Sequence, residues 1–189
     1  MTSVINALAF PISNGFLGKI QVEGTPYLRE RQETYVIFVL DNSGSMGNAS
    51  NEFIANIDNL MKSMKLTQAA LIIFTSDVKT MRSSEGGYFM TSQEIQRVHI
   101  GSQGSTMFAH VPEQLEQILY TIPVDSKCDI IVISDGDIHD PDMSNYNINS
   151  FVSRCSRRPG GINVSLLQYR DMGEVKALAC LARLNTTPN

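Results

Sequence analysis

The sequence has no apolar run long enough to cross a membrane. Its longest purely apolar stretches have the length of strands: Val36 to Leu40, Ala69 to Phe74 and Ile130 to Ile133. A membrane-spanning helix requires about 20 such residues. The N-terminus also lacks the positively charged region and the long apolar segment of a secretory signal. We therefore expect a cytoplasmic protein that makes no contact with a membrane.

Cysteine is scarce, and histidine is not arranged to bind zinc. The three cysteines cannot all pair with one another, and Cys128 and Cys180 lie among apolar residues of expected regular elements. Buried, reduced thiols are the simplest interpretation. His99 and His110 have no cysteine or aspartate beside them at the spacing of a zinc site.

Basic residues are fewer than acidic ones. The chain has 15 Lys and Arg against 19 Asp and Glu, a net charge of −4, with both signs interspersed. A protein that binds the phosphate backbone of nucleic acid normally shows a basic patch. The local cluster Arg154, Arg157 and Arg158 falls at the end of an expected helix, where cations suit the helix dipole. We expect no nucleic-acid partner.

Several catalytic motifs are missing. No Gly-x-Ser-x-Gly marks a nucleophilic serine, and no Gly-rich loop contains the Gly-Lys-Ser/Thr of a phosphate-binding loop. The segment Gly136-Asp137-Ile-His139-Asp140 resembles the first metal motif of calcineurin-like phosphoesterases, but the further Gly-Asp-x-x-Asp and Gly-Asn-His segments of that family do not follow. We therefore interpret His139 as an exposed loop histidine.

Strand-like and helix-like patterns alternate along most of the 189 residues, of which 42% are hydrophobic. Short apolar runs predict buried parallel strands, and apolar residues at three- and four-residue spacing predict amphipathic helices between them. The expected order is strand 35–40, helix 50–65, strand 69–74, an edge hairpin with a small helix near Ser92 and a possible strand Val98 to Ile100, helix 111–119, strand 129–133, helix 148–155, strand 162–167 and helix 175–182. This order predicts an α/β fold, a doubly wound, mostly parallel sheet flanked by helices, with one antiparallel edge strand.

Residues 1–34 precede this pattern and form an N-terminal extension. They contain two strand-like pieces, Ala7 to Ile12 and Leu17 to Val22, separated by Asn14-Gly15. Asn-Gly between such pieces predicts a β-hairpin. The extension would cover a sheet edge or end a preceding domain, and residues 35–189 would form the main domain.

Polar side chains follow two of the expected strands at the point where each ends. Asp41, Ser43 and Ser45 come directly after the first strand, and Asp135 follows strand 129–133. Parallel strands end at the same edge of a sheet, where such folds bind ligands. Thr106, at the end of the flexible loop Gly101-Ser-Gln-Gly-Ser-Thr106, can bring a further hydroxyl to this edge.

These five side chains offer only oxygen ligands, two carboxylates and three hydroxyls. Two unpaired carboxylates on neighbouring strands would repel each other, and a bound cation removes that conflict. An all-oxygen set selects Mg²⁺, Mn²⁺ or Ca²⁺ over Zn²⁺. With few charged ligands, the ion should keep waters and an open position that an external anion could fill.

The pattern closely resembles the von Willebrand factor A (VWA) domain and its metal-ion-dependent adhesion site. The resemblance is carried by Asp41-x-Ser43-x-Ser45, Thr106 and Asp135-Gly136, each after the expected element, and runs from about Tyr35 to Leu184. It implies Mg²⁺ bound by Asp41, Ser43, Ser45, Thr106 and Asp135, with a Glu or Asp of a partner protein at the sixth position. A family member usually closes with a further strand, which this sequence does not show after Leu184.

The resemblance favours a metal-dependent protein-binding module over two alternatives. One is a scaffold subunit of an intracellular assembly whose contacts avoid the metal. The other is a metal-dependent phosphoester hydrolase, which needs a general base. The nearby candidates for that base are Asp137, His139, Asp140 and Asp142, and loops this acidic would repel an anionic substrate. We therefore do not expect an enzyme.

Overall fold

The computed structural model describes residues 4–12, 15–23, 33–101, 104–169, 178 and 180–185. The chain divides into two compact units, Met1–Glu33 and Thr34–Asn189. In the first, β1 (Val4–Ile12) pairs antiparallel with β2 (Gly15–Glu23), with Ile12 opposite Gly15.

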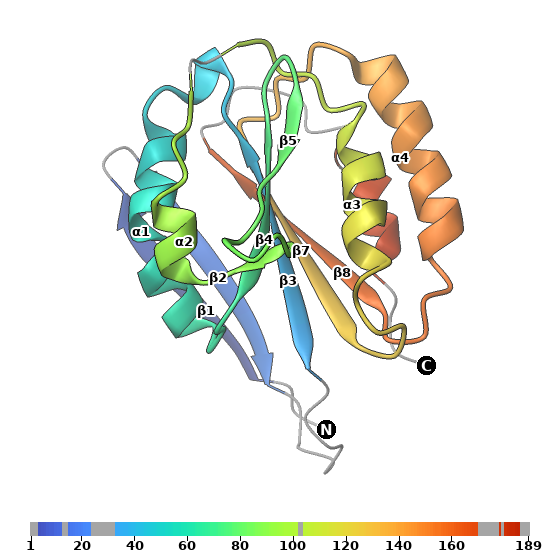
Figure 1. The fold of residues 1–189 in the computed structure, drawn as a ribbon, viewed down its shortest axis with the longest axis horizontal. Helices are drawn as coiled ribbons and strands as arrows, with labels where there is room; N and C mark the ends of the chain where they lie inside the picture. The colour runs from blue at the N-terminus through green and yellow to red at the C-terminus, as the bar shows by residue number, and fades with distance from the viewer. Residues whose placement is uncertain are drawn as a thin grey trace. The chain divides into compact units, whose positions relative to one another are not determined.

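The second unit is built on a mostly parallel sheet with the strand order β5-β4-β3-β7-β8 (Figure 1). Its parallel strands are β3 (Thr34–Asp41), β4 (Ala69–Phe74), β7 (Lys127–Ser134) and β8 (Ile162–Gln168). The helices are η1 (Gly44–Met46), α1 (Ala49–Ser63), α2 (Ser92–Gln96), α3 (Val111–Leu119), α4 (Pro141–Cys155) and η2 (Cys180–Leu184). The predicted fold class is confirmed.

Strand β3 lies between β4 and β7 and is covered on both faces. Its side chains alternate between two apolar clusters, with Val36, Phe38 and Leu40 in one and Ile37 and Val39 in the other. The first cluster includes the apolar side of α1 and Ile95 of α2, and the second includes residues of α3 and α4. This two-sided burial explains why the strand sequence is continuously apolar.

The edge beyond β4 differs from the prediction. Two short strands, β5 (Val78–Thr80) and β6 (Phe89–Met90), each pair antiparallel with β4 and together replace the predicted hairpin. Residues Val98 to Ile100 are not a strand, so that part of the prediction was wrong. The small helix near Ser92 is confirmed as α2, which begins with a capping box between Thr91 and Glu94.

Near the C-terminus, the predicted helix 175–182 falls largely outside the described residues. The described part is η2, followed by Asn185, which forms an isolated parallel bridge with Ile162 of β8. The Asn185 side chain also exchanges hydrogen bonds with both backbone groups of Val164. Asn185 thus occupies a strand-like position beside β8.

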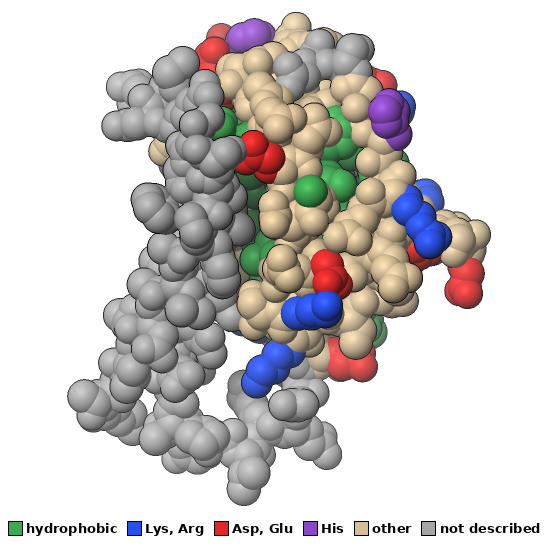
Figure 2. Space-filling model, turned by 90° about the vertical axis from the view of Figure 1, so that its left-hand side faces the viewer, with side chains coloured by type: hydrophobic (Ala, Val, Ile, Leu, Met, Phe, Trp, Pro, Cys, Tyr) green, Lys and Arg blue, Asp and Glu red, His purple; other side chains and the backbone are tan. Residues whose placement is uncertain are grey.

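Thiols and surface charge follow the sequence expectations where they are described. Cys128 is buried and free, and burial raises the pKa of its thiol to about 12; the Cys180 side chain lies outside the described residues. On the face shown in Figure 2, acidic and basic side chains are mixed and do not gather by sign. Within the described ranges, no helix is long and apolar enough to cross a membrane.

Candidate metal centre

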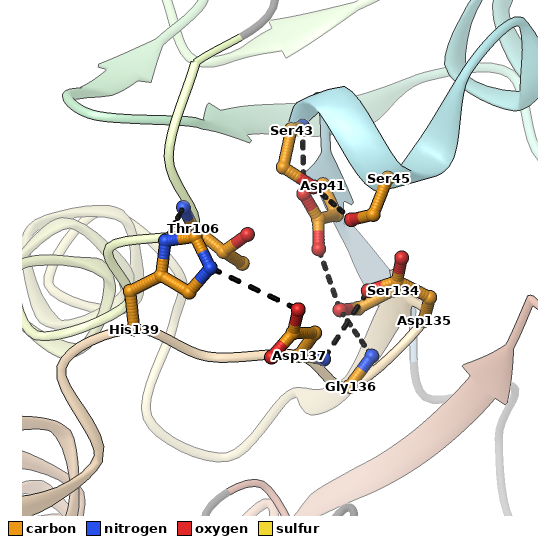
Figure 3. Close-up of polar contacts among 9 residues, drawn as sticks. All are labelled: Asp41, Ser43, Ser45, Thr106, Ser134, Asp135, Gly136, Asp137 and His139. Atoms are coloured by element: carbon orange, nitrogen blue, oxygen red, sulfur yellow. Dashed lines mark hydrogen bonds and ion pairs between the residues drawn. The ribbon is translucent and has the colours of Figure 1, made fainter. Parts of the chain in front are cut away.

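The ends of β3 and β7 lie side by side because the two strands pair in parallel with Leu40 opposite Ile133. One residue further along, the Ser134 hydroxyl donates a 2.6 Å hydrogen bond to Asp41 Oδ2 (Figure 3). The same Ser134 oxygen accepts a 3.0 Å bond from the Gly136 amide. Ser134 therefore joins the two strand ends that carry Asp41 and Asp135.

The carboxylate of Asp41 is fully buried. Burial raises its pKa above the ordinary value, hydrogen bonds from Ser134 and Ser43 act in the opposite direction, and the nearby charge of Asp135 raises it further. The Ser43 amide donates to Asp41 Oδ1 at 2.9 Å, and the Ser50 hydroxyl donates to the Asp41 carbonyl at 2.7 Å. A cation nearby would favour the charged form of Asp41.

Two of the predicted hydroxyls are in direct contact. Ser43 and Ser45 lie on the turn that leads into and through η1, and their Oγ atoms are 3.0 Å apart. Each hydroxyl also has acceptor lone pairs for a cation. The Gly44 amide donates to the Gly104 carbonyl at 3.1 Å, which brings the segment containing Thr106 alongside this turn.

Thr106 reaches the site from a third segment and is 1% exposed. Its carbonyl accepts a 2.9 Å bond from the His139 amide, and its amide donates to His139 Nδ1 at 3.4 Å. His139 is half-exposed, as predicted, and its Nε2 lies 3.8 Å from Asp137 Oδ2. However, its Nδ1 accepts a hydrogen bond from the Thr106 amide, a contact that no sequence pattern predicts.

Asp135 has the carboxylate that would gain most from a bound cation, because it is buried and its hydrogen bonding is incomplete among the described residues. It is 1% exposed, and its Oδ1 accepts a 3.2 Å bond from the Asp137 amide. Its Oδ2 is buried and has no hydrogen-bond partner among the described residues. A buried carboxylate oxygen without a partner is costly, and a bound metal ion would remove that cost.

The donor set fits a hard divalent cation. The turn after β3 contributes Asp41, Ser43 and Ser45, the turn after β7 contributes Asp135, and the segment before α3 contributes Thr106 (Figure 3). Among the described residues, no group of three or more His, Cys, Asp or Glu could hold a metal. A site here therefore depends on hydroxyl as well as carboxylate oxygens, which suits Mg²⁺ and does not suit Zn²⁺.

Ser134 is a residue of the candidate site that the sequence interpretation missed. It is the last residue of the apolar strand β7 and is 1% exposed, and its hydroxyl bonds to Asp41 across the strand pair. The sequence does show a hydroxyl residue directly before Asp135. Its contact with Asp41 follows only once the register between β3 and β7 is known, because that register places Ser134 beside Asp41.

Comparisons with known proteins bear on the same region. A family profile described as von Willebrand factor type A domain matches residues 36–137, more than half of the chain. An aerotolerance-related membrane protein from Bacteroides fragilis superposes with a TM-score of 0.52 at 20% identity, covering 72% of this chain and 67% of that one. Proximal thread matrix protein 1 from the mussel byssus has a TM-score of 0.59 at 15% identity, covering 79% of this chain and 39% of that one. No curated protein matches the sequence. At these identities, the structural likeness shows the fold alone.

Proposed function

Because this chain belongs to the von Willebrand factor type A domain family, we propose that it is a binding module that holds a protein partner through a bound Mg²⁺. The ion would be held by Asp41, Ser43, Ser45, Thr106 and Asp135. Mn²⁺ or Ca²⁺ would suit the same oxygens. When bound, the ion supplies positive charge between the two carboxylates and an open position for a Glu or Asp of the partner.

One observation carries this proposal: the buried Oδ2 of Asp135, for which the described part of the chain offers no hydrogen-bond partner. A folded protein rarely retains such an oxygen unless something outside the chain completes it. The pKa of Asp41 is raised mainly by burial and to a smaller extent by the Asp135 charge, and a nearby cation would offset both effects. The two carboxylates are in electrostatic conflict without a cation and compatible with one.

The surroundings of the site favour binding over hydrolysis. Among the predicted candidates for a general base, His139 accepts the Thr106 amide through Nδ1, and both oxygens of Asp140 accept backbone amides. Groups committed to such bonds are poorly available to take a proton from water. Asp137 is exposed and places negative charge beside the site, which would repel a phosphoester.

The proposal is tested first with the metal alone. Isothermal titration of the full chain with MgCl₂ should give one site per chain, and Thr106→Ala should weaken the affinity at least about ten-fold while the fold is retained. Thr121→Ala is the matched control, because the Thr121 hydroxyl, just after α3, bonds within the described residues only to the nearby Ile118 carbonyl. Failure of the wild-type chain to bind Mg²⁺, Mn²⁺ or Ca²⁺ would refute the proposal.

Partner binding with and without metal distinguishes the scaffold alternative from the metal-dependent module. Proteins retained from an extract by the immobilised chain should be released by EDTA and should be lost from Thr106→Ala but not from Thr121→Ala. Retention that is equal with and without EDTA would assign the contacts to a metal-independent scaffold.

A further inference from the structure

The segment that carries Thr106 is held almost entirely by other parts of the fold. Five successive amides, those of residues 105–109, each donate a hydrogen bond to a residue at least 29 positions away. The Ser105 and Met107 amides donate to Ser76 and Thr75 after β4, at 2.9 and 2.8 Å. The other three donate to the segment that starts α4.

Asp140 is the centre of that second group of contacts. Its Oδ1 accepts the Phe108 amide at 2.9 Å, and its Oδ2 accepts the Ala109 amide at 3.0 Å. The buried Ser144 hydroxyl adds a 2.8 Å bond to Oδ1. The carboxylate thus accepts a hydrogen bond from α4 through Oδ1 and bonds from the Thr106 segment through both of its oxygens.

The use of this carboxylate is unusual for its position. Asp140 stands at the N-cap of α4, where an aspartate side chain ordinarily accepts an amide of its own helix, yet its carboxylate caps no amide of α4. It serves the amides of a segment about 30 residues earlier instead. The bonds between His139 and the Thr106 backbone, and from Asn147 Nδ2 to the Ala109 carbonyl at 2.7 Å, add to the same junction.

We propose that Asp140 is a positioning residue for the metal centre: by binding the Phe108 and Ala109 amides, it fixes where the Thr106 hydroxyl lies. The inference rests on the proposed function and adds that Thr106 and the start of α4 form one unit. Asp140 touches none of the metal-binding side chains through its own oxygens in the described contacts, so it acts through the backbone. Outer groups that orient metal ligands typically contribute 10- to 100-fold in affinity.

A double-mutant cycle tests this role. Asp140→Asn keeps the shape of the side chain but replaces one acceptor oxygen with an NH₂ group, which cannot accept a hydrogen bond from the backbone N–H that faces it. We expect it to weaken Mg²⁺ affinity about ten-fold by calorimetry in the wild-type background. In the Thr106→Ala background, the same substitution should change Mg²⁺ affinity less than about two-fold, because the ligand it positions is gone.

Glu94→Gln is the matched control. The Glu94 carboxylate also accepts hydrogen bonds from two backbone amides and two hydroxyls, those of Ser84 and Thr91. Thr91 follows Met90, which pairs with Ala69 at the start of β4, so Glu94 lies near the end of β4 that is opposite the candidate site. Glu94→Gln should lower the melting temperature in EDTA, as Asp140→Asn does, and leave Mg²⁺ affinity unchanged.

The outcomes are distinct. Wild-type affinity for Mg²⁺ in Asp140→Asn, or an equal loss in both backgrounds, overturns the positioning role while leaving the proposed function intact. Absence of Mg²⁺ binding by the wild-type chain instead overturns the proposed function and this inference with it. If Asp140→Asn does not fold, Ser144→Ala decides: it removes one donor to Asp140 and should weaken Mg²⁺ affinity only while Thr106 is present.

Discussion

Replacing Asp135 with asparagine should have opposite effects on the metal-free and metal-bound protein. The buried Oδ2 of Asp135 has no partner among the described residues, and the Asp135 charge adds to the effect of burial in raising the pKa of Asp41. Asparagine has nearly the same shape and keeps an oxygen for the Asp137 amide, which donates to Oδ1 at 3.2 Å. The substitution therefore removes mainly the charge, so the metal-free protein should become more stable and metal binding should be lost.

The expected magnitudes follow from the burial of this group. Removing the repulsion while leaving one buried amide imperfectly satisfied should raise the free energy of unfolding without metal by about 1 kcal/mol. For a domain of this size, that corresponds to a rise in melting temperature of roughly 2 to 4 °C. In the wild-type chain, Mg²⁺ at about 100 times its Kd should add about 2.7 kcal/mol, or roughly 5 to 11 °C. The variant should show almost none of this increase.

The assay is thermal unfolding in EDTA and in MgCl₂, followed by far-ultraviolet circular dichroism because the chain has no tryptophan. Asp129→Asn is the control, since Asp129 lies on β7, the strand that Asp135 follows, but is paired with Lys127 at 3.3 Å and accepts a hydrogen bond from Asn163 at 3.0 Å. It should leave the Mg²⁺ increase unchanged. A full Mg²⁺ increase in Asp135→Asn, or a lower melting temperature in EDTA than the wild type, would refute the reasoning.

Two further predictions concern regions away from the metal centre. Hydrogen bonds from the amides and hydroxyls of Ser84 and Thr91 lower the pKa of Glu94 from 4.5 to about 2. Because the pKa of Glu94 is lower in the folded than in the unfolded state, the stability that its carboxylate contributes is complete above pH 4.5 and is lost as the pH falls toward 2. Glu94→Gln should flatten the dependence of stability on pH in that window, measured by urea unfolding, and a profile as steep as that of the wild type would contradict this. A Cβ on Gly160 would lie 2.1 Å from the Ser126 carbonyl oxygen, so Gly160→Ala should destabilise the fold by about 1 to 3 kcal/mol in thermal unfolding. Gly87→Ala, whose nearest contact would be 3.4 Å from Ser83 Oγ, should be close to neutral, and equal effects of the two would contradict the steric argument.

The central strands of the sheet could be predicted from the sequence because each of them is a short run of consecutive apolar residues. A run such as Ala69 to Phe74, fully buried in the structure, cannot be mistaken for a surface segment. The alternation of runs and amphipathic helices then determines parallel pairing, and parallel pairing brings the residues after β3 and β7 to one edge. Their assignment as metal ligands stays a prediction.

Features that depend on distant contacts could not be read in the same way. The strands β5 and β6 have three and two residues and exist only because β4 offers a free edge to each. Helix α4 was predicted only from Ile148, because its first turns, from Pro141, are mostly polar. Asp140 consequently looked like a loop acid that could serve as a base, whereas its carboxylate bonds to two distant backbone amides and the Ser144 hydroxyl, which no sequence pattern reveals.

The run of amides from Ser105 to Ala109 also fixes the length of the short connection directly before α3. Surface connections usually accept inserted residues because few of their backbone groups are committed. Here each successive N–H has its own distant acceptor, so one added residue would move every later donor out of phase with its acceptor. A reporter peptide or affinity tag therefore belongs in the exposed turn around Gly86, which is closed by its own short-range bonds to Ser83, and not in the connection before α3.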